Sequence, residues 1–308
     1  MLLLRLTVTT CLYLFTLGMQ AQVFNDVATQ MGIIHTDNST RPGGGVSFAD
    51  FDGDGFDDLT FATAAGESLR FYKNTSTGLS LLPDPTGNLA EVKQILWVDY
   101  DNDGDQDLFC SSFDGPVFLY RRDGDWLFTE VTAAAGIPVV NKRHYGAAFG
   151  DYDRDGWVDL YYSQRKLVGQ LSASQNRMFR NQADGTFAEV TNLAGVADPG
   201  RIPFCIGFTD YDGDRWPDLY VANDRDTRNT LFRNQANGTF TDVSEDSGAG
   251  ISIDAMNMGL GDYDNDGDED IFVTNIEEGC KLLRNNSDGT FTEVADETGV
   301  GFYGIGWG

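Results

Sequence analysis

The sequence has little of the chemistry on which most enzymes depend. Among its 308 residues there are only two histidines, His35 and His144. We find no spaced Ser/His/Asp or Cys/His set that would support nucleophilic catalysis. Basic residues are also few, since 21 Lys and Arg stand against 48 Asp and Glu, and the net charge is −27. So acidic a chain repels nucleic acid phosphates and anionic lipid headgroups, which disfavours both as partners.

Cysteine is equally scarce. Cys11 lies in the N-terminal apolar segment, and the other three, Cys110, Cys205 and Cys280, are widely separated. An odd, scattered set does not indicate a disulfide framework. We therefore expect buried free thiols. A Cys205–Cys280 bridge is the alternative.

Only the N-terminus carries a sizeable apolar stretch. Residues 1–21 have the features of a signal peptide: Arg5 is the only charge, residues 12–17 are mostly apolar, and Ala21 is a suitable cleavage residue. Threonines interrupt the stretch, which is short for a membrane span. An uncleaved anchor is the alternative. We expect a secreted protein, extracellular or in the cell envelope, with no membrane span after signal removal.

Aspartate, in contrast, is abundant and regularly spaced. Residues 50–58 have Asp at positions 1, 3, 5 and 9 and Gly at position 6, and Leu59 then opens an apolar run. The pattern returns at 99–107, 151–159, 210–218 and 262–270, at intervals of roughly 50 residues. The predicted metal ligands are the twenty aspartates of these loops: Asp50, Asp52, Asp54, Asp58, Asp99, Asp101, Asp103, Asp107, Asp151, Asp153, Asp155, Asp159, Asp210, Asp212, Asp214, Asp218, Asp262, Asp264, Asp266 and Asp270.

This spacing suits a hard divalent cation. Calcium takes 6–8 oxygen ligands, and alternate side chains on a tight loop can converge on one ion. Without a cation, carboxylates packed together repel one another. An EF-hand would need Glu at position 12 and flanking helices, but position 12 is never acidic here and a β-prone run follows each loop. We expect about one Ca²⁺ for each complete repeat. The alternative is a set of acidic turns that only solvate the surface.

The repeat contains four short strands. In the third repeat we predict strands over 145–150, 159–163, 177–181 and 186–191, with a hairpin turn at Asp184-Gly185. Asp123-Gly124, Asn237-Gly238 and Asp288-Gly289 occupy the same place in their repeats, and such pairs favour type I′ turns. Four antiparallel strands in about 50 residues indicate a blade of an all-β propeller over residues 22–308. A string of independent hairpins is the rival fold. The predicted blades are 44–90, 93–138, 144–197, 203–250 and 256–300.

Both ends of the repeat array look incomplete. Residues 23–33 resemble the segments that close four of the five repeats, so we expect them to supply a ring-closing strand. Residues 303–308 resemble the stretch before Asp262, so we expect them to begin a sixth blade. The sequence therefore predicts a fragment of a propeller with six or seven blades.

The loops resemble those of a known family. Residues 149–156, Phe-Gly-Asp-Tyr-Asp-Arg-Asp-Gly, are similar to FG-GAP (VCBS-type) repeats, which include the integrin α-subunit propellers. Together with segments such as 187–196, they resemble the secreted, cartilage acidic protein-like (ASPIC/UnbV-associated) propellers. The resemblance implies a seven-bladed propeller with calcium between the first and second strands of each blade. One departure is Arg215, which stands where the fourth loop should have glycine, so we expect that site to be the weakest.

The expected function is extracellular adhesion or ligand binding, with calcium in a structural role. The connections opposite the metal loops carry cations that are unexpected in so acidic a chain. We predict that they form a face for an anionic glycan or protein; the alternative is that they pair locally with acidic residues. The predicted face comprises Lys142, Arg143, His144, Arg165, Lys166, Arg201, Arg225 and Arg228. The alternative function is a non-catalytic part of a carbohydrate-active enzyme, such as a calcium-dependent polysaccharide lyase.

Overall fold

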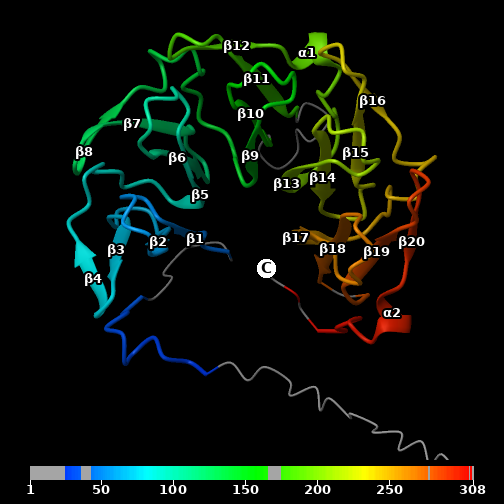
Figure 1. Cartoon of the computed structure of the whole chain (residues 1–308), viewed down its shortest axis with the longest axis horizontal. Coiled ribbons are helices and arrows are strands. Elements are labelled where there is room, and N and C mark those ends of the chain that lie inside the picture. The colour runs from blue at the N-terminus through cyan, green and yellow to red at the C-terminus, as the bar shows by residue number, and fades with distance from the viewer. Residues whose placement is uncertain (1–24, 36–42, 166–174, 277, 305, 307–308) are drawn as a thin grey trace, which may run out of the picture. The chain divides into compact units, whose positions relative to one another are not determined.

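The computed structural model describes residues 25–35, 43–165, 175–276, 278–304 and 306. The chain divides into two compact units, residues 1–34 and 35–308. The second unit is an all-β propeller of five four-stranded antiparallel blades (Figure 1). The predicted signal peptide, residues 1–21, lies outside the described residues.

Each blade follows the chain from its first strand to its fourth. Blade 1 holds β1 (Val46–Ala49), β2 (Asp58–Phe61), β3 (Arg70–Thr75) and β4 (Gly78–Leu82); blade 2 holds β5 (Val92–Val98), β6 (Asp107–Ser112), β7 (Phe118–Gly124) and β8 (Leu127–Glu130); blade 3 holds β9 (Ala147–Gly150), β10 (Asp159–Tyr162), β11 (Arg177–Asn181) and β12 (Phe187–Glu189); blade 4 holds β13 (Pro203–Thr209), β14 (Asp218–Asn223), β15 (Thr230–Asn234) and β16 (Phe240–Asp242); and blade 5 holds β17 (Ala255–Gly261), β18 (Asp270–Asn275), β19 (Lys281–Asn285) and β20 (Phe291–Glu293). Two short helices, α1 (Thr191–Ala194) and α2 (Ala295–Thr298), follow the fourth strands of blades 3 and 5.

The first strands lie innermost and the fourth strands outermost within the second unit (Figure 1). Each first strand contacts the first strand of the next blade, from β1 to β5, β9, β13 and β17. All five aspartate-rich loops join a first strand to a second strand, so every loop is held by a sheet on both sides. The loops between second and third strands pair instead with the connections between blades, as the bridges Arg143–Arg165 and Arg228–Ser252 illustrate.

The core consists of apolar layers between neighbouring blades. Between blades 2 and 3, for example, Phe109 and Leu119 pack with Leu160 and Phe179, and all four are fully buried. Equivalent layers lie between blades 1 and 2, blades 3 and 4, and blades 4 and 5. Burying one such side chain contributes about 1.5–3 kcal/mol. Since each sheet is covered by its neighbours, the blades stabilise one another, and this excludes a string of independent hairpins.

The predicted strands of blade 3 agree with the observed ones to within three residues at each end. The predicted turn type is wrong. Ala183 and Gly185 have positive φ angles, whereas a type I′ turn needs two consecutive positive values at its central residues. The backbone N–H of Gln182 donates to Thr186 O at 2.9 Å, which closes a longer loop, and Asp184 caps it by accepting the N–H of Thr186 at 3.0 Å. In blade 2, Gly124 lies in β7 itself, paired with Leu127, and not in the turn.

The segment predicted to close the ring, residues 23–33, forms no strand in its described part. It forms the turn that follows the fourth strand in the blades: Met31 N–H donates to Val27 O at 3.0 Å, as Ala135 N–H does to Val131 O at 2.7 Å. A strand needs a neighbouring edge, and each of the five blades already has its own fourth strand. The described residues of 303–308 likewise form no strand, so no sixth blade is present in the part that the structure describes.

All three cysteines beyond the N-terminal segment, Cys110, Cys205 and Cys280, are free. This confirms the expectation of free thiols and excludes the Cys205–Cys280 bridge. Cys110 and Cys280 are buried, and Cys205 is partly buried.

In blades 2, 3 and 4, the turn after the fourth strand brings a glycine against the fourth strand of the following blade. Gly136 has φ = 80°, and a Cβ there would lie 2.6 Å from Phe187 O in blade 3. Gly185 has the same backbone conformation, but nothing lies within 4 Å of its Cβ position. We expect Gly136→Ala to lower the free energy of unfolding by roughly 2–4 kcal/mol, because strain and a backbone clash add. Gly185→Ala should cost only about 1 kcal/mol. Urea unfolding of both variants measures the difference, and equal losses would contradict this account.

Candidate metal centres

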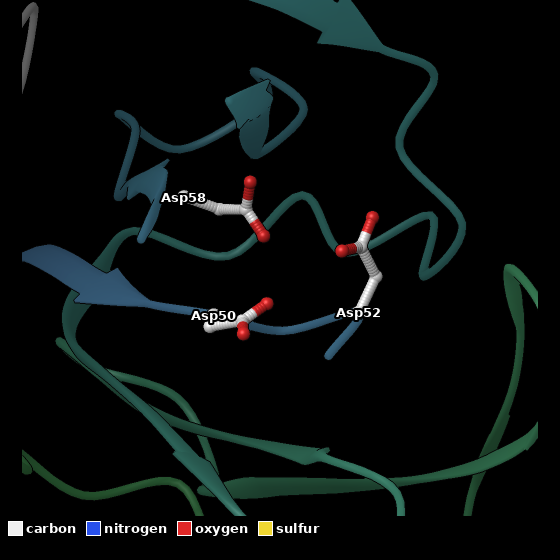
Figure 2. Close-up of side chains that lie close together, drawn as sticks. All are labelled: Asp50, Asp52 and Asp58. Carbon is white, nitrogen blue, oxygen red and sulfur yellow. The ribbon is translucent and has the colours of Figure 1, made fainter. Parts of the chain in front are cut away.

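Each loop brings three aspartates together. We number the loops 1 to 5 in chain order and the positions 1 to 9 within each. The carboxylates at positions 1, 3 and 9 offer oxygens that all lie within 4.8 Å of one another in every loop. In loop 1, Asp50, Asp52 and Asp58 turn their carboxyl groups toward a common point (Figure 2). The other Asp triads are Asp99, Asp101 and Asp107; Asp151, Asp153 and Asp159; Asp210, Asp212 and Asp218; and Asp262, Asp264 and Asp270.

The aspartates at position 5 do not join the triads. In each loop, one carboxyl oxygen of position 5 accepts the backbone N–H of position 7, as in Asp54 with Phe56 at 3.1 Å and Asp155 with Trp157 at 3.0 Å. The same bond forms at Asp103, Asp214 and Asp266. This short-range bond is typical of aspartate in tight turns. Fifteen of the twenty predicted ligands are therefore brought together. The five at position 5 cap the turn with one oxygen and stay predicted ligands through the other.

Backbone amides fix the carboxylates at positions 1 and 9. In loop 1, Asp50 accepts the N–H of Asp54 at 3.0 Å and that of Gly55 at 2.8 Å. Asp58 accepts the N–H of Phe51 at 3.1 Å and that of Asn74, on the third strand of the blade, at 2.6 Å. Position 9 is bonded in the same way in all five loops. The loop thus holds these carboxylates in place through its own backbone amides.

Several buried oxygens of the triads lack a hydrogen-bond partner in the described residues. They are Oδ1 of Asp52, Asp101 and Asp153, each at position 3, and Oδ1 of Asp210 at position 1 of loop 4. Leaving a buried acceptor unsatisfied costs about 1–3 kcal/mol, so such atoms usually mark the place of a ligand or water. Because each of these oxygens belongs to a cluster of hard donors, the residues fit a divalent cation.

Burial makes the carboxylate at position 9 hard to ionise when no cation is bound. Burial raises the pKa of Asp107 to about 7 and the pKa values of Asp159 and Asp218 to about 8, with smaller contributions from neighbouring aspartates. Burial also raises the pKa of Asp58 and of Asp270. The backbone N–H bonds oppose this shift but do not cancel it, so a positive charge near the triad would favour the ionised carboxylate.

A basic residue on the third strand also contacts the loop, and sequence analysis missed it. Lys73 forms an ion pair with Asp52 and lies 3.2 Å from Asp54. Arg180 lies 2.6 Å from Asp153 and 3.1 Å from Asp155. Arg233 makes the corresponding contacts in blade 4, 2.7 Å from Asp212. The signal was a basic residue followed by an asparagine at or next to the end of the third strand. Its acidic partner is determined only by the pairing of second and third strands.

Loop 4 differs from the others at position 6. Arg215 has φ = 71°, a conformation that the other four loops give to glycine. Its N–H still donates to Asp210 Oδ2 at 3.0 Å. The N–H of Asp214, however, turns to Asp212 at 3.3 Å instead of Asp210, and Oδ1 of Asp210 is left without a partner. Loop 4 keeps its triad but holds the carboxylate at position 1 by one backbone bond instead of two.

We expect Arg215→Gly to stabilise the protein by about 1 kcal/mol, because glycine adopts positive φ without strain. We also expect it to strengthen cation binding at loop 4. Urea unfolding measures the first effect and a calcium titration the second. Arg154→Gly is the matched control, since Arg154 also has a positive φ, 57°, but stands at position 4 of loop 3. A lower stability or a weaker affinity in Arg215→Gly would contradict the prediction.

The residues of the predicted ligand face are largely paired with acids. Arg143 lies 2.8 Å from Asp114, Arg165 3.5 Å from Asp224, Arg201 3.8 Å from Asp198 and Arg225 3.9 Å from Asp224. Arg228 pairs with Asp242 and Glu245. Two of these pairs are local in sequence, Arg201 with Asp198 and Arg225 with Asp224. The partners of Arg143, Arg165 and Arg228 come from more distant segments, so sequence reading could not assign them. The local pairing offered as the alternative therefore applies to five of the eight residues.

The remaining three residues of that face differ in kind. His144 is fully buried, its Nδ1 lies 2.8 Å from Ser163 O, and burial lowers the pKa of its imidazole to about 4, so it is neutral at pH 7. Lys142 donates its backbone N–H to Gly115 O at 3.1 Å. Lys166 lies outside the described residues. His144 therefore adds no charge to the face.

Comparison with known proteins decides the family. The profile described as FG-GAP-like repeat matches residues 99–162, 167–221, 210–273 and 262–308, which is more than half of the chain. The chain belongs to the FG-GAP-like repeat family. The matched ranges contain loops 2 to 5 of this FG-GAP protein, and loop 1 shares their triad and hydrogen bonds.

Similar proteins include cartilage acidic protein 1. The FG-GAP protein is 27% identical to the mouse protein over 182 residues and 26% identical to the human protein over 182 residues. The mouse alignment covers 56% of this chain and 27% of the relative, so this chain corresponds to about a quarter of that protein. A solved lectin of Agrocybe aegerita, described as recognising non-reducing terminal N-acetylglucosamine, has a TM-score of 0.51 at 18% identity, covering 81% of this chain and 64% of the lectin. This last similarity concerns the fold alone.

No helix in the described residues of the FG-GAP protein has the length and apolar character needed to cross a membrane.

Proposed function

We propose that this FG-GAP protein is an exported calcium-binding module in which calcium stabilises the propeller. The observation that supports it best is the recurrence of five Asp triads, four of which contain a buried oxygen that has no partner among the described residues. A bound calcium ion would supply the positive charge that offsets repulsion among three carboxylates. The chain's own part is to hold those carboxylates by backbone bonds and to place each loop between two strands.

The stoichiometry of calcium tests this proposal. Native mass spectrometry and isothermal titration of protein freed of metal by chelation should find about five bound ions, one for each triad. Asp58→Asn should remove one ion, because Asp58 belongs to the triad of loop 1. Asp57→Asn makes the same change of charge at an exposed neighbour and should leave the count unchanged. A protein that binds no calcium at millimolar concentration would refute the proposal.

We also propose that the complete ring has six or seven blades. The aromatic side chains at position 2 of loops 1 to 4 are buried against the following blade, as in Tyr211 with Phe291. Their counterpart in loop 5, Tyr263, is 40% exposed. This is the exposure expected of a blade whose neighbour is not among the described residues. A structure of the complete gene product in which five blades close the ring would contradict the proposal.

The partner we propose is an extracellular glycan or protein with negative charge, and no nucleic acid. Among the paired cations of the predicted ligand face, Arg225 is the most open, with 58% of its side chain exposed. Binding of polygalacturonate, an acidic glycan, should weaken in the double variant Arg143→Ser, Arg225→Ser. Arg121→Ser is the control, because Arg121 lies toward the end of the third strand of blade 2, away from the connection between second and third strands. Equal binding by all three proteins would exclude this face as the site.

Export is proposed from residues 1–21. N-terminal sequencing of protein released by cells that express the full chain should begin after Ala21. Retention in the cytoplasm with Met1 intact would contradict it.

A further inference from the structure

Neighbouring loops are joined by a buried side chain. Asn234, the last residue of β15 in blade 4, donates a hydrogen bond from Nδ2 to Tyr152 O, which is position 2 of loop 3, at 2.8 Å. Asn181 makes the same bond to Tyr100 O of loop 2 at 2.8 Å, and Asn285 to Tyr211 O of loop 4 at 2.7 Å. All three asparagines are 2% exposed. Each of them therefore crosses from its own blade to the loop of the preceding blade.

The same asparagines hold the carboxylate at position 9 of their own loops. The backbone N–H of Asn234 donates to Asp218 Oδ1 at 2.7 Å. The other oxygen of Asp218 accepts the N–H of Tyr211, whose carbonyl accepts from Asn285. The carboxylate of Asp218 is thus bonded to Asn234, which contacts the preceding loop, and to Tyr211, which the next blade contacts.

These bonds form a continuous series through all five loops. Asp107, Asp159, Asp218 and Asp270 are linked in that order by the position-2 residues and the three asparagines. Blade 2 has Arg122 in place of asparagine. Its Nη1 donates to Phe51 O of loop 1, and its backbone N–H donates to Asp107 Oδ1 at 2.8 Å. The series therefore extends from loop 1 to loop 5.

A second contact crosses each boundary at the same residue. The ring of Tyr152 lies 5.7 Å from that of Phe240 on the fourth strand of blade 4, and the ring of Tyr100 lies 5.8 Å from that of Phe187 in blade 3. The position-2 residue is thus fixed by the next blade through both its carbonyl and its side chain. Since it lies between two ligands of the triad, ordering the loop also orders the surface on which the next blade packs.

We propose that Asn181, Asn234, Asn285 and Arg122 are positioning residues that couple neighbouring calcium sites, so that the loops fill cooperatively. The inference rests on the calcium binding proposed above. When one loop is filled, its position-2 residue would be fixed in place. The asparagine of the next blade bonds to that residue and also holds the position-9 carboxylate of the next loop. Coupling between sites requires such a contiguous element that both sites bias. The side-chain amide of Asn234 is also held in place by its own blade, because it donates to Pro217 O and accepts the N–H of Ala236.

Calcium titration of the full chain tests the coupling, with Asn74 as the matched control. Asn74 lies one residue before the end of the third strand of blade 1 and donates its N–H to Asp58, but in the described residues its amide reaches only Asp57 O of its own loop. The wild type should bind calcium with a Hill coefficient above 1. In Asn234→Ala the curve should split, with loops 4 and 5 about 5- to 10-fold weaker at unchanged total stoichiometry. Asn74→Ala should keep the steepness of the wild type.

Asn285→Ala provides a second variant in case Asn234→Ala does not fold. This variant uncouples only loop 5 from the other loops. Four ions should therefore bind cooperatively, and the fifth should bind independently. A wild-type Hill coefficient of 1, an unchanged curve in a folded variant, or an equal change in Asn74→Ala would overturn the coupling. Absence of calcium binding by the wild type would instead reject the proposed function, so the two failures are distinguishable.

Discussion

Removing calcium should lower the midpoint of thermal unfolding by more than about 10 °C. At a concentration 100 times its Kd, an ion that binds only the folded state stabilises it by about 2.7 kcal/mol. For domains of 150–250 residues each kcal/mol corresponds to roughly 2–4 °C, so even two such ions suffice. The physical source is the group of three carboxylates in each loop, which repel one another when the ion is absent.

Differential scanning calorimetry in 2 mM calcium and in excess chelator measures this shift. Magnesium at the same concentration is a useful control, because it requires near-ideal octahedral geometry and dehydrates reluctantly. Asp52→Asn should reduce the calcium-dependent shift, whereas Asp57→Asn should not, since only Asp52 belongs to a triad. An unchanged midpoint after complete chelation would show that the loops are stable without metal and that calcium is not structural.

Without calcium, the free energy of unfolding should fall by several kcal/mol as the pH rises from 5 to 8. Burial raises the pKa of Asp107 to about 7 and those of Asp159 and Asp218 to about 8. In the unfolded chain these groups ionise near pH 4. Between pH 4 and 8 the folded state therefore binds more protons than the unfolded state, so stability is greatest at low pH and decreases as pH rises.

Urea unfolding in chelator at pH 5 and pH 8 tests this dependence. Calcium should remove most of it, because a bound cation favours the ionised carboxylates. The net charge of −27 also destabilises the fold at high pH, but 0.5 M NaCl screens exposed charges far more than buried ones. The decrease should therefore persist in salt. A stability that stays constant or increases from pH 5 to 8 in chelator would contradict the raised pKa values.

The local parts of this molecule could be predicted from the sequence because local spacing determines them. Aspartates at positions 1, 3 and 9 predicted the triads, and the β-prone residues after each loop predicted the second strands. The same reading placed position 5 among the ligands, and one oxygen of Asp54 also accepts the N–H of Phe56. Spacing alone does not reveal that one oxygen of each position-5 carboxylate caps its own turn.

The parts that sequence reading missed depend on contacts between distant segments. Arg180 reaches Asp153 only because β11 pairs with β10 in one register. Asn234 bonds to a carbonyl 82 residues earlier in the chain, in another blade. In the predicted ligand face, Arg143 pairs with Asp114, which lies 29 residues away in the chain. Such partners follow from strand register and blade packing, which a single sequence does not reveal.

The free thiols have a practical consequence. Since Cys110, Cys205 and Cys280 form no disulfide, every cross-link we describe between blades is a reversible, non-covalent one. Glutathione should then leave the propeller intact, while a chelator should loosen it. A bacterial cytoplasm, which is reducing and low in free calcium, should thus yield a loosely assembled protein that tightens on purification into a calcium buffer.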